Sequence, residues 1–216
     1  MSLYKKKFNF LKKNSIAEKF FNTFLIIIII NWFFQGIRGM QSKEFIFRII
    51  FELLWIFFFY IVLEINFIFS IILSHTLFWI FFCQFWVIMR YSSFYSNNIN
   101  NLNKTYKNLL TKIQKSKYLE KAVIIGSIPK VKQFEHTNSD LDLRFFFSNN
   151  INDFLIINFF LFYLRTYAFF KKFPLDVYSY DNFAIFKKFN KKDKILIIKD
   201  KNNSIKKYLK KNGYKL

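Results

Sequence analysis

One run of residues constrains the fold more than any other: residues 49–89 carry only two charged side chains, Glu52 and Glu64. A membrane-spanning helix needs about 20 predominantly apolar residues, so this run is longer than one span requires and too apolar for a soluble core helix. The run therefore predicts a membrane-associated helical region. The alternative is an unusually apolar soluble helical domain, in a chain whose coding background favours Phe and Ile.

Within this region the sequence favours one spanning helix around residues 53–73 and a break at residues 74–76. A second apolar segment, residues 77–89, is expected to lie in the membrane interface or to re-enter the bilayer. An earlier uncharged segment, residues 20–34, is short for a span, and no signal-peptide cleavage pattern follows it, so we expect it to be retained. The tryptophans all lie in these segments, as expected of interfacial anchors: Trp32, Trp55, Trp79 and Trp86.

Basic residues flank the apolar segments on both sides. Positively charged flanks stay in the cytoplasm, so both ends of the region are expected there, with an even number of crossings or a segment that dips without crossing. The chain carries 34 Lys and Arg against 13 Asp and Glu, a formal net charge of +21. This balance favours a soluble acidic partner, a nucleotide or an anionic membrane surface. The single cysteine, Cys83, excludes a disulfide framework and fits a reducing compartment.

The composition changes at the polar, turn-rich residues 91–100, which we interpret as a domain boundary. The predicted parts are a basic N-terminal segment (1–19), a membrane-associated helical region (20–90), a folded domain (101–200) and a basic C-terminal tail (201–216). In the folded domain, apolar periodicity predicts helices and strands in alternation. The expected helices are 101–116 and 152–172, and the expected strands are 122–125, 141–147, 175–180 and 195–198. This order predicts an α/β (α+β) domain with a small mixed sheet flanked by helices.

Two scarce acids, Asp140 and Asp142, stand one residue apart at the start of an apolar strand. Residues i and i+2 of a strand project from the same face, so both carboxylates point one way while Leu141 and Leu143 turn to the core. An unpaired buried pair of carboxylates would repel itself, so a positive group is expected between them. Asp176 has the same apolar flanks on the next strand. If the two strands are neighbours, three carboxylates converge and suit Mg²⁺ or Mn²⁺.

The strand at residues 122–125 ends in Gly126 and Ser127, and a spacer then leads to Ser139-Asp140-Leu141-Asp142. Glycine lets the backbone approach a phosphate closely, and the serine hydroxyl can bind phosphate oxygens. Together with the later acid Asp176, this order of motifs resembles the DNA polymerase beta-type nucleotidyltransferase superfamily, in the form of its minimal domains. The resemblance covers about 100 residues, and the apolar region lies outside it.

The resemblance implies transfer of a nucleoside monophosphate from a nucleoside triphosphate (NTP) to a hydroxyl group, with release of pyrophosphate. The catalytic residues that it implies, which also bind Mg²⁺ or Mn²⁺, are Asp140, Asp142 and Asp176. Gly126 and Ser127 would contact the NTP phosphates. Lys130 stands where many members have arginine and is expected to face the phosphates, and we group Ser139 with these nucleotide-binding residues.

Membrane attachment places the protein at the cell membrane, with the catalytic domain facing the cytoplasm and a membrane-linked acceptor; a protein acceptor is the second enzymatic option. Two departures from the family pattern support a non-catalytic alternative. Val131 replaces a glycine, and Lys130 is a point charge without the planar fork of arginine. In this alternative, a degenerate nucleotidyltransferase domain acts as a basic module at a membrane surface or on nucleic acid, a partner that the enzymatic hypothesis does not favour.

For four other charged residues we expect specific local contacts. Arg144, directly after the strand acids, is expected to pair with one of them or to contact a phosphate. Asp181 is expected to cap the helical residues 182–186. Glu52 and Glu64 are expected to pair with Arg48 or with partners in a helical bundle.

Overall fold

The computed structural model describes residues 24–214, except 36, 83–84, 93, 127, 129–131, 149 and 192. The chain forms two compact units, Met1–Ile37 and Arg38–Leu216. The first contains helix α2 (Phe24–Phe34), whose 11 residues extend about 16 Å, roughly half the thickness of a hydrocarbon core. The predicted basic segment 1–19 lies outside the described residues, and so do Ser127 and Lys130 of the candidate site.

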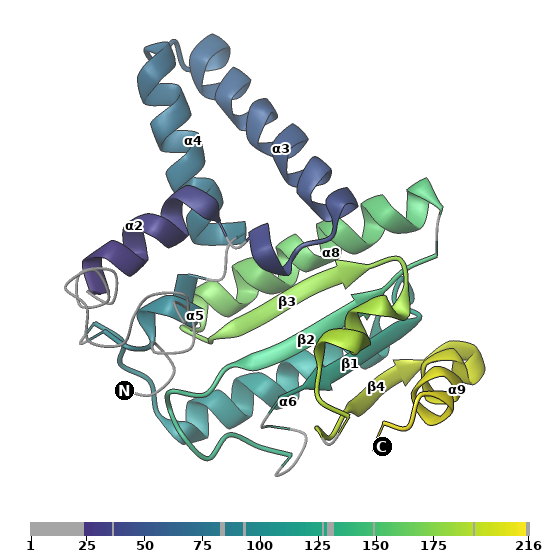
Figure 1. Cartoon of the computed structure of the whole chain (residues 1–216). Coiled ribbons are helices and arrows are strands. Elements are labelled where there is room, and N and C mark those ends of the chain that lie inside the picture. Colours follow the sequence, from purple (N-terminus) through teal and green to yellow (C-terminus); the bar gives the residue numbers. More distant parts are fainter. Residues whose placement is uncertain are drawn as a thin grey trace, which may run out of the picture. The chain divides into compact units, whose positions relative to one another are not determined.

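The second unit combines a four-stranded sheet with a set of helices (Figure 1). Its described helices are α3 (Ser42–Phe57), α4 (Phe67–Phe82), α5 (Phe85–Met89), α6 (Ile99–Lys115), α8 (Ile151–Phe170) and α9 (Ser204–Lys211). The strands are β1 (Lys121–Ile125), β2 (Leu141–Phe146), β3 (Leu175–Tyr180) and β4 (Leu196–Asp200). Shorter helical segments are η2 (Ile37–Gly39), the π-helical η3 (Phe58–Val62), η4 (Phe183–Lys188) and η5 (Lys201–Asn203).

The sheet has the order β3-β2-β1-β4 and is mixed. Strands β2 and β3 are parallel, because α8 returns the chain to the same end of the sheet, while β1 pairs antiparallel with both β2 and β4. The predicted α/β domain with a small mixed sheet is confirmed at this level, and each predicted strand lies within a few residues of an observed one.

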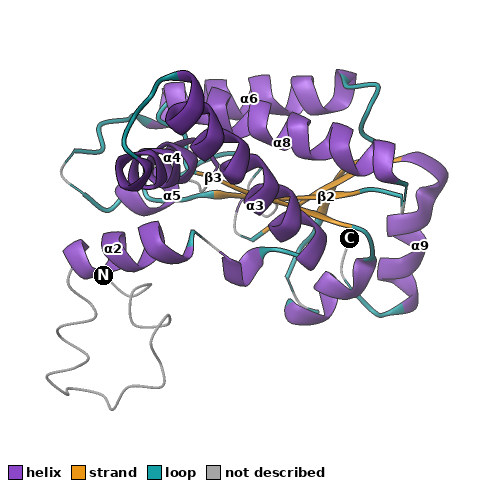
Figure 2. Ribbon diagram, turned by 90° about the horizontal axis from the view of Figure 1, so that it is seen from above, coloured by secondary structure: helices purple, strands orange, loops and turns teal. Residues whose placement is uncertain are grey.

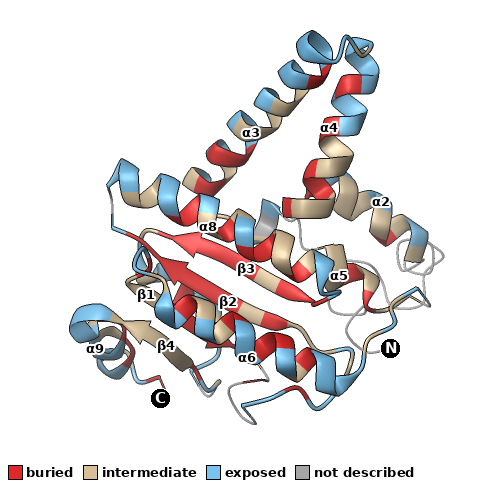
Figure 3. Cartoon of the chain, turned by 180° about the vertical axis from the view of Figure 1, so that it is seen from behind, coloured by how far each residue is buried: buried red, intermediate tan, exposed pale blue. Residues whose placement is uncertain are grey.

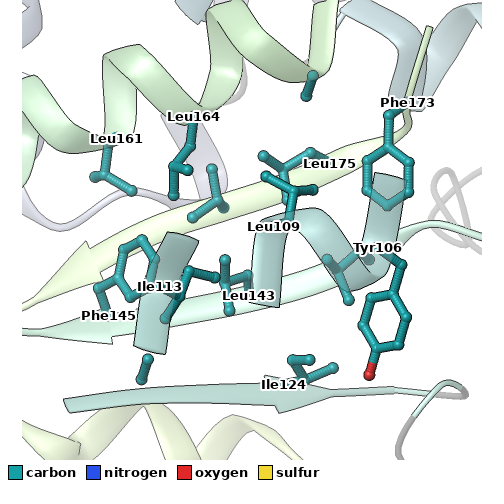
Figure 4. Packing of buried hydrophobic residues seen from close by; sticks show 14 of the residues in the cluster. Tyr106, Leu109, Ile113, Ile124, Leu143, Phe145, Leu161, Leu164, Phe173 and Leu175 are labelled. Carbon is teal, nitrogen blue, oxygen red and sulfur yellow. The ribbon is translucent and has the colours of Figure 1, made fainter. Parts of the chain in front are cut away.

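Helices α6 and α8 lie side by side on one face of the sheet (Figure 2). They meet the apolar side of the strands in a core from which water is excluded (Figure 4). Leu141 and Leu143 are fully buried in this core, as their alternation with the acids predicted. The same alternation turns the side chains of Asp142 and Asp176 to the opposite face of the sheet.

A second, smaller core covers that opposite face near β1 and β4. Helix α9 contributes Ile205 and Leu209 to it, and Tyr214 is also buried there. The segment predicted as a basic tail (201–216) thus contains the short helix α9, and its buried residues Ile205 and Leu209 make it part of the fold.

The start of η4 corrects one predicted cap. Asn182, rather than Asp181, accepts a hydrogen bond from the first turn, with 2.9 Å between its Oδ1 atom and the backbone nitrogen of Ala184. Asp181 is engaged elsewhere: its carboxylate pairs with Lys43 at 2.9 Å and accepts a hydrogen bond from Gln41. Both partners lie at the start of α3, a contact that sequence spacing does not reveal.

Helices α3 and α4 form a hairpin that projects from the domain and leaves many apolar side chains exposed (Figure 3). The predicted break at residues 74–76 is wrong, and so is the single span over residues 53–73, because the helix breaks at residues 63–66. There Glu64 adopts a positive φ of 52°, and the Asn66 side chain accepts a hydrogen bond from the Ile68 N–H at the start of α4. Thr76 does not interrupt α4, because its hydroxyl donates to the Ile72 carbonyl at 2.7 Å.

The predicted boundary at residues 91–100 does not separate compact units, since the hairpin and the sheet domain belong to one unit. Aromatic rings join the base of the hairpin to α8. The Phe47 ring lies 5.5 Å from that of Phe159, and the Phe82 ring stacks on Phe162 at 4.4 Å. These contacts are as close as those inside a core, so the hairpin base and the domain form one packed body.

Candidate active site

Asp142 and Asp176 lie next to each other at the start of two parallel strands. They are register partners, Asp142 on β2 and Asp176 on β3. Each is the second residue of its strand and follows a buried leucine, so strand alternation directs both carboxylates to the face away from α6 and α8. The predicted meeting of these two acids on neighbouring strands is present in the structure.

Arg144 is the positive group of this pair. One of its terminal nitrogens, Nη2, lies 3.3 Å from Asp142 Oδ1 and 3.0 Å from Asp176 Oδ2. The other, Nη1, donates to the backbone carbonyls of Leu143 (2.9 Å) and Asp176 (2.8 Å). Its guanidinium also stacks over the Tyr178 ring at 5.1 Å. The sequence predicted a positive group between Asp140 and Asp142; the structure instead places it between Asp142 and Asp176.

Asp140 stands immediately before β2 and pairs with a different arginine. Arg90 Nη1 lies 2.8 Å from Asp140 Oδ2, and the Arg90 side chain is buried against the Tyr91 ring. Arg90 follows α5, at the end of the segment that carries the hairpin. Arg90 lies outside the predicted domain (101–200), so its contact with Asp140 was not predicted from the sequence. Its position as the first charge after a long apolar run was the only available signal.

Gly126 ends β1 against the Asp142 carboxylate. Its φ is +99°, and a Cβ atom added at this position would lie 2.8 Å from Asp142 Oδ2. Only glycine fits, because a side chain here would be strained in its backbone and would collide with the acid. The predicted turn and the predicted acid pair therefore meet. Ser139 belongs to a turn before the acids, in which its N–H donates to the His136 carbonyl at 3.2 Å.

The two paired acids differ in their affinity for a proton. Burial raises the pKa of Asp142 well above its usual range, and the carboxylates of Asp176 and Asp140 raise it further. Burial also disfavours the charged form of Asp176, but the Arg144 guanidinium, a hydrogen bond with Asp142 and the charge of Arg165 together outweigh this effect and lower the pKa of Asp176. A hydrogen bond between the two carboxyl groups acts in the same directions, because it raises the pKa of Asp142 and lowers that of Asp176. Of the two acids, Asp142 therefore binds a proton more readily.

The chemistry of this donor set fits a hard divalent cation. Carboxylate oxygens are the ligands that Mg²⁺ and Mn²⁺ prefer, and a cation beside Asp142 would replace its proton. Among the described residues, no three His, Cys, Asp or Glu side chains converge as a ready metal site. Asp140 is directed to Arg90, so a cation bound by all three acids would compete with Arg90 for Asp140.

A second buried network supports β3 from the base of the hairpin. Glu44, in the first turn of α3, is 1% exposed and pairs with Arg48 at 2.7 Å and Arg165 at 2.8 Å. Its other oxygen accepts hydrogen bonds from the Ser179 N–H (2.9 Å) and hydroxyl (3.3 Å) on β3. This network ties the hairpin to the strand that carries Asp176. Of the two kinds of partner expected for Glu52, Arg48 pairs instead with Glu44, whereas His75 on the neighbouring helix α4 lies 2.6 Å from Glu52.

Comparisons with known proteins add no relative. No protein-family model matches the chain, and no curated protein or solved structure matches it.

Proposed function

We propose that this protein is a membrane-attached, metal-dependent nucleotidyltransferase of the DNA polymerase beta type, which transfers a nucleoside monophosphate from an NTP to a hydroxyl group. The observation that carries the proposal is the meeting of Asp142, Asp176 and Gly126. Two acids on parallel strands lie beside a glycine whose missing side chain leaves room for the Asp142 carboxylate. The same missing side chain would let a phosphate approach these carboxylates closely, which supports a nucleotide-binding role for the turn.

Residues of this chain would have separate roles in the transfer reaction. A divalent cation bound at Asp140, Asp142 and Asp176 would neutralise the triphosphate and favour ionisation of the attacking hydroxyl. Asp176, oriented by Arg144, would accept the proton of that hydroxyl, made more acidic by the cation, or would hold a second cation. The acceptor oxygen then forms a bond to the α-phosphorus, the bond from this phosphorus to the bridging oxygen breaks, and pyrophosphate leaves. Arg144 and Gly126 hold Asp176 and Asp142 in position before the substrate arrives.

The hairpin supports attachment to a membrane. Two helical segments are long and apolar enough to cross one by length and composition, namely Ser42–Val62 and Ile151–Phe170. The first is the outgoing arm of the hairpin, and α4 returns the chain to the domain, which supports the proposal that both basic flanks lie on one side of the membrane. The base of the hairpin is bonded to β3 through Glu44, a few residues from Asp176. This closeness of site and hairpin favours a membrane-linked acceptor over a protein acceptor.

The test is NTP-dependent release of pyrophosphate by the full-length protein in lipid nanodiscs with Mg²⁺. We expect release with at least one NTP, and its loss in Asp142→Asn. Glu120→Gln, which changes an exposed acid paired with Lys201, is the matched control and keeps full activity. Mass spectrometry of membranes incubated with isotopically labelled NTP then identifies the acceptor. Release that is equal in wild type and Asp142→Asn would contradict the proposal.

One observation favours the second candidate, a catalytically degenerate domain acting as a basic module at a membrane surface or on nucleic acid. All three acids are already paired with arginines, Asp140 with Arg90 and the other two with Arg144. A site whose charges are satisfied internally can persist without a metal. Salt-sensitive binding to anionic vesicles or RNA that Asp142→Asn leaves unchanged, with no pyrophosphate release, is the result that this alternative predicts.

A further inference from the structure

Helices α6 and α8 pack on the same face of the sheet, yet their outward sides differ in chemistry. The exposed residues of α6 are polar except Ile99. Those of α8 are apolar or aromatic except Asn152, and we call six of them the outer face of α8: Ile151, Leu155, Ile156, Phe159, Tyr163 and Phe170. At 100° per residue, this face occupies about 140° of the helix circumference, opposite the side buried on the sheet. The same layer of the domain thus presents one polar helix and one apolar helix.

The outer face of α8 is continuous with the exposed apolar surface of the hairpin. Phe159, 49% exposed, has its ring 5.5 Å from Phe47 and 6.0 Å from Phe51 at the base of α3. At the other end of α8, the ring of Phe170, 71% exposed, lies 6.2 Å from Phe81 near the end of α4. Figures 1 and 3 show α8 running beneath the two arms of the hairpin. A medium that surrounds the hairpin therefore also reaches α8.

We infer that α8 lies along the surface of an anionic bilayer, with its outer face in the boundary between headgroups and acyl chains, while the α3–α4 hairpin inserts below it. The inference rests on the membrane attachment in the proposed function but not on catalysis. Helix α8 does not span the membrane, since Leu161 and Leu164 are buried against the sheet. Exposed Lys171 and Lys172 follow its last turn and meet anionic headgroups, which a net charge of +21 also favours.

This position has a consequence for the acceptor. Strand β3 is the edge of the sheet bonded to the hairpin base, and β2 is next to it. The two strands that carry Asp142 and Asp176 are therefore the half of the sheet nearest the bilayer. With α8 lying flat on the membrane surface, the domain has two points of attachment, the hairpin and α8. It therefore cannot rotate away from the membrane about the hairpin. The site works at a fixed, short height above the headgroups, which suits an acceptor hydroxyl on a lipid headgroup or a lipid-linked molecule.

The test places one fluorescent nitrobenzoxadiazole probe on each of three exposed positions in a Cys83→Ala background. Leu155→Cys reports on the outer face of α8, Gln114→Cys on the polar side of α6, and Leu54→Cys on the hairpin, where Leu54 is 58% exposed. The full-length protein is reconstituted in vesicles of phosphatidylcholine and phosphatidylglycerol. Lipids with a doxyl quencher near the carbonyl end of the acyl chain then measure probe depth.

We expect roughly two-fold or stronger quenching at Leu155→Cys and Leu54→Cys, and none at Gln114→Cys, because an interfacial helix sits about 5–10 Å deep. Quenching at Leu54→Cys without quenching at Leu155→Cys would overturn the inference and leave membrane attachment intact. A blue-shifted but unquenched probe at Leu155→Cys would also overturn it, and would indicate a second copy of the chain on this face. An absence of quenching at all three positions would refute membrane attachment itself, whereas pyrophosphate release in the same samples tests catalysis separately.

Discussion

Gly126→Ala is the perturbation that most sharply separates a catalytic turn from an ordinary one. At φ +99° the alanine backbone is strained by about 1–3 kcal/mol. In addition, the new Cβ would lie 2.8 Å from Asp142 Oδ2, so the carboxylate must retreat by about 0.6 Å to an ordinary contact of 3.4 Å. A displacement approaching 1 Å in a site that works by positioning can reduce the rate by about 100-fold.

Gly213→Ala provides the matched control. Gly213 also has a positive φ, +72°, but an added Cβ would meet no atom within 4 Å. Both variants should lose about 1–3 kcal/mol in the free energy of unfolding, measured by urea titration. Only Gly126→Ala should also lose pyrophosphate release, by about 10- to 100-fold at a temperature where both variants are folded. Equal activity in the two folded variants would refute the close approach of Gly126 to a working carboxylate.

The acid pair and its supports give three further predictions. Asp142→Asn should stabilise the fold near neutral pH, because the pKa of Asp142 is raised in the folded state. In the wild type, ionisation of Asp142 destabilises the fold only as the pH rises above about 3.8. The urea midpoints of the wild type and the variant should therefore converge in acid. Asp176→Asn should have the opposite sign, a loss of about 1.5–3 kcal/mol near neutral pH that disappears as pH falls, because Arg144 lowers the pKa of Asp176 and its stabilisation is lost on protonation. Parallel pH profiles for the two variants would contradict the opposite directions in which the pKa values of the two acids are shifted. Glu44→Gln should destabilise the protein by about 3–5 kcal/mol in thermal or urea unfolding, because it leaves two buried arginines without their anion. The control Glu120→Gln should leave the unfolding midpoint unchanged. Similar midpoints for these two variants would show that the Glu44 network does not hold the hairpin to the sheet.

Strand alternation is the reason the acid pair was predictable. A single period-two pattern sets Leu141 and Leu143 in the core and Asp142 on the other face, and the equivalent pattern around Asp176 needs only parallel pairing to bring the two acids together. The two arginines that pair with the acids differed in how well their contacts could be predicted. Arg144 lies on the same strand and was considered, whereas Arg90 reaches Asp140 from a segment 50 residues earlier in the chain. Its pairing depends on tertiary packing that local spacing does not encode.

The structure of the hairpin was predicted less well than the acid pair. The length of the apolar run predicted a membrane-associated region, but a break at residues 74–76 did not follow from the polarity of Ser74 and Thr76, because a hydroxyl in a helix can bond to a preceding carbonyl. The actual break depends on Asn66 as a cap and on the positive φ of Glu64, weak signals within an otherwise apolar sequence. Likewise, the acidic residue just before the apolar run, Glu44, gave no sign that it would bond to Ser179 on the far strand.

Binding of Mn²⁺ measured by electron paramagnetic resonance, with a non-hydrolysable NTP analogue present, tests the central claim most directly. The full-length protein in nanodiscs should bind nucleotide-associated Mn²⁺ in the wild type and in Glu120→Gln, and Asp142→Asn should lower that affinity by about 10-fold or more. Mn²⁺ binding that is the same in all three proteins, or absent from all of them, would mean that the acids beneath Gly126 serve only to pair with Arg144 and Arg90.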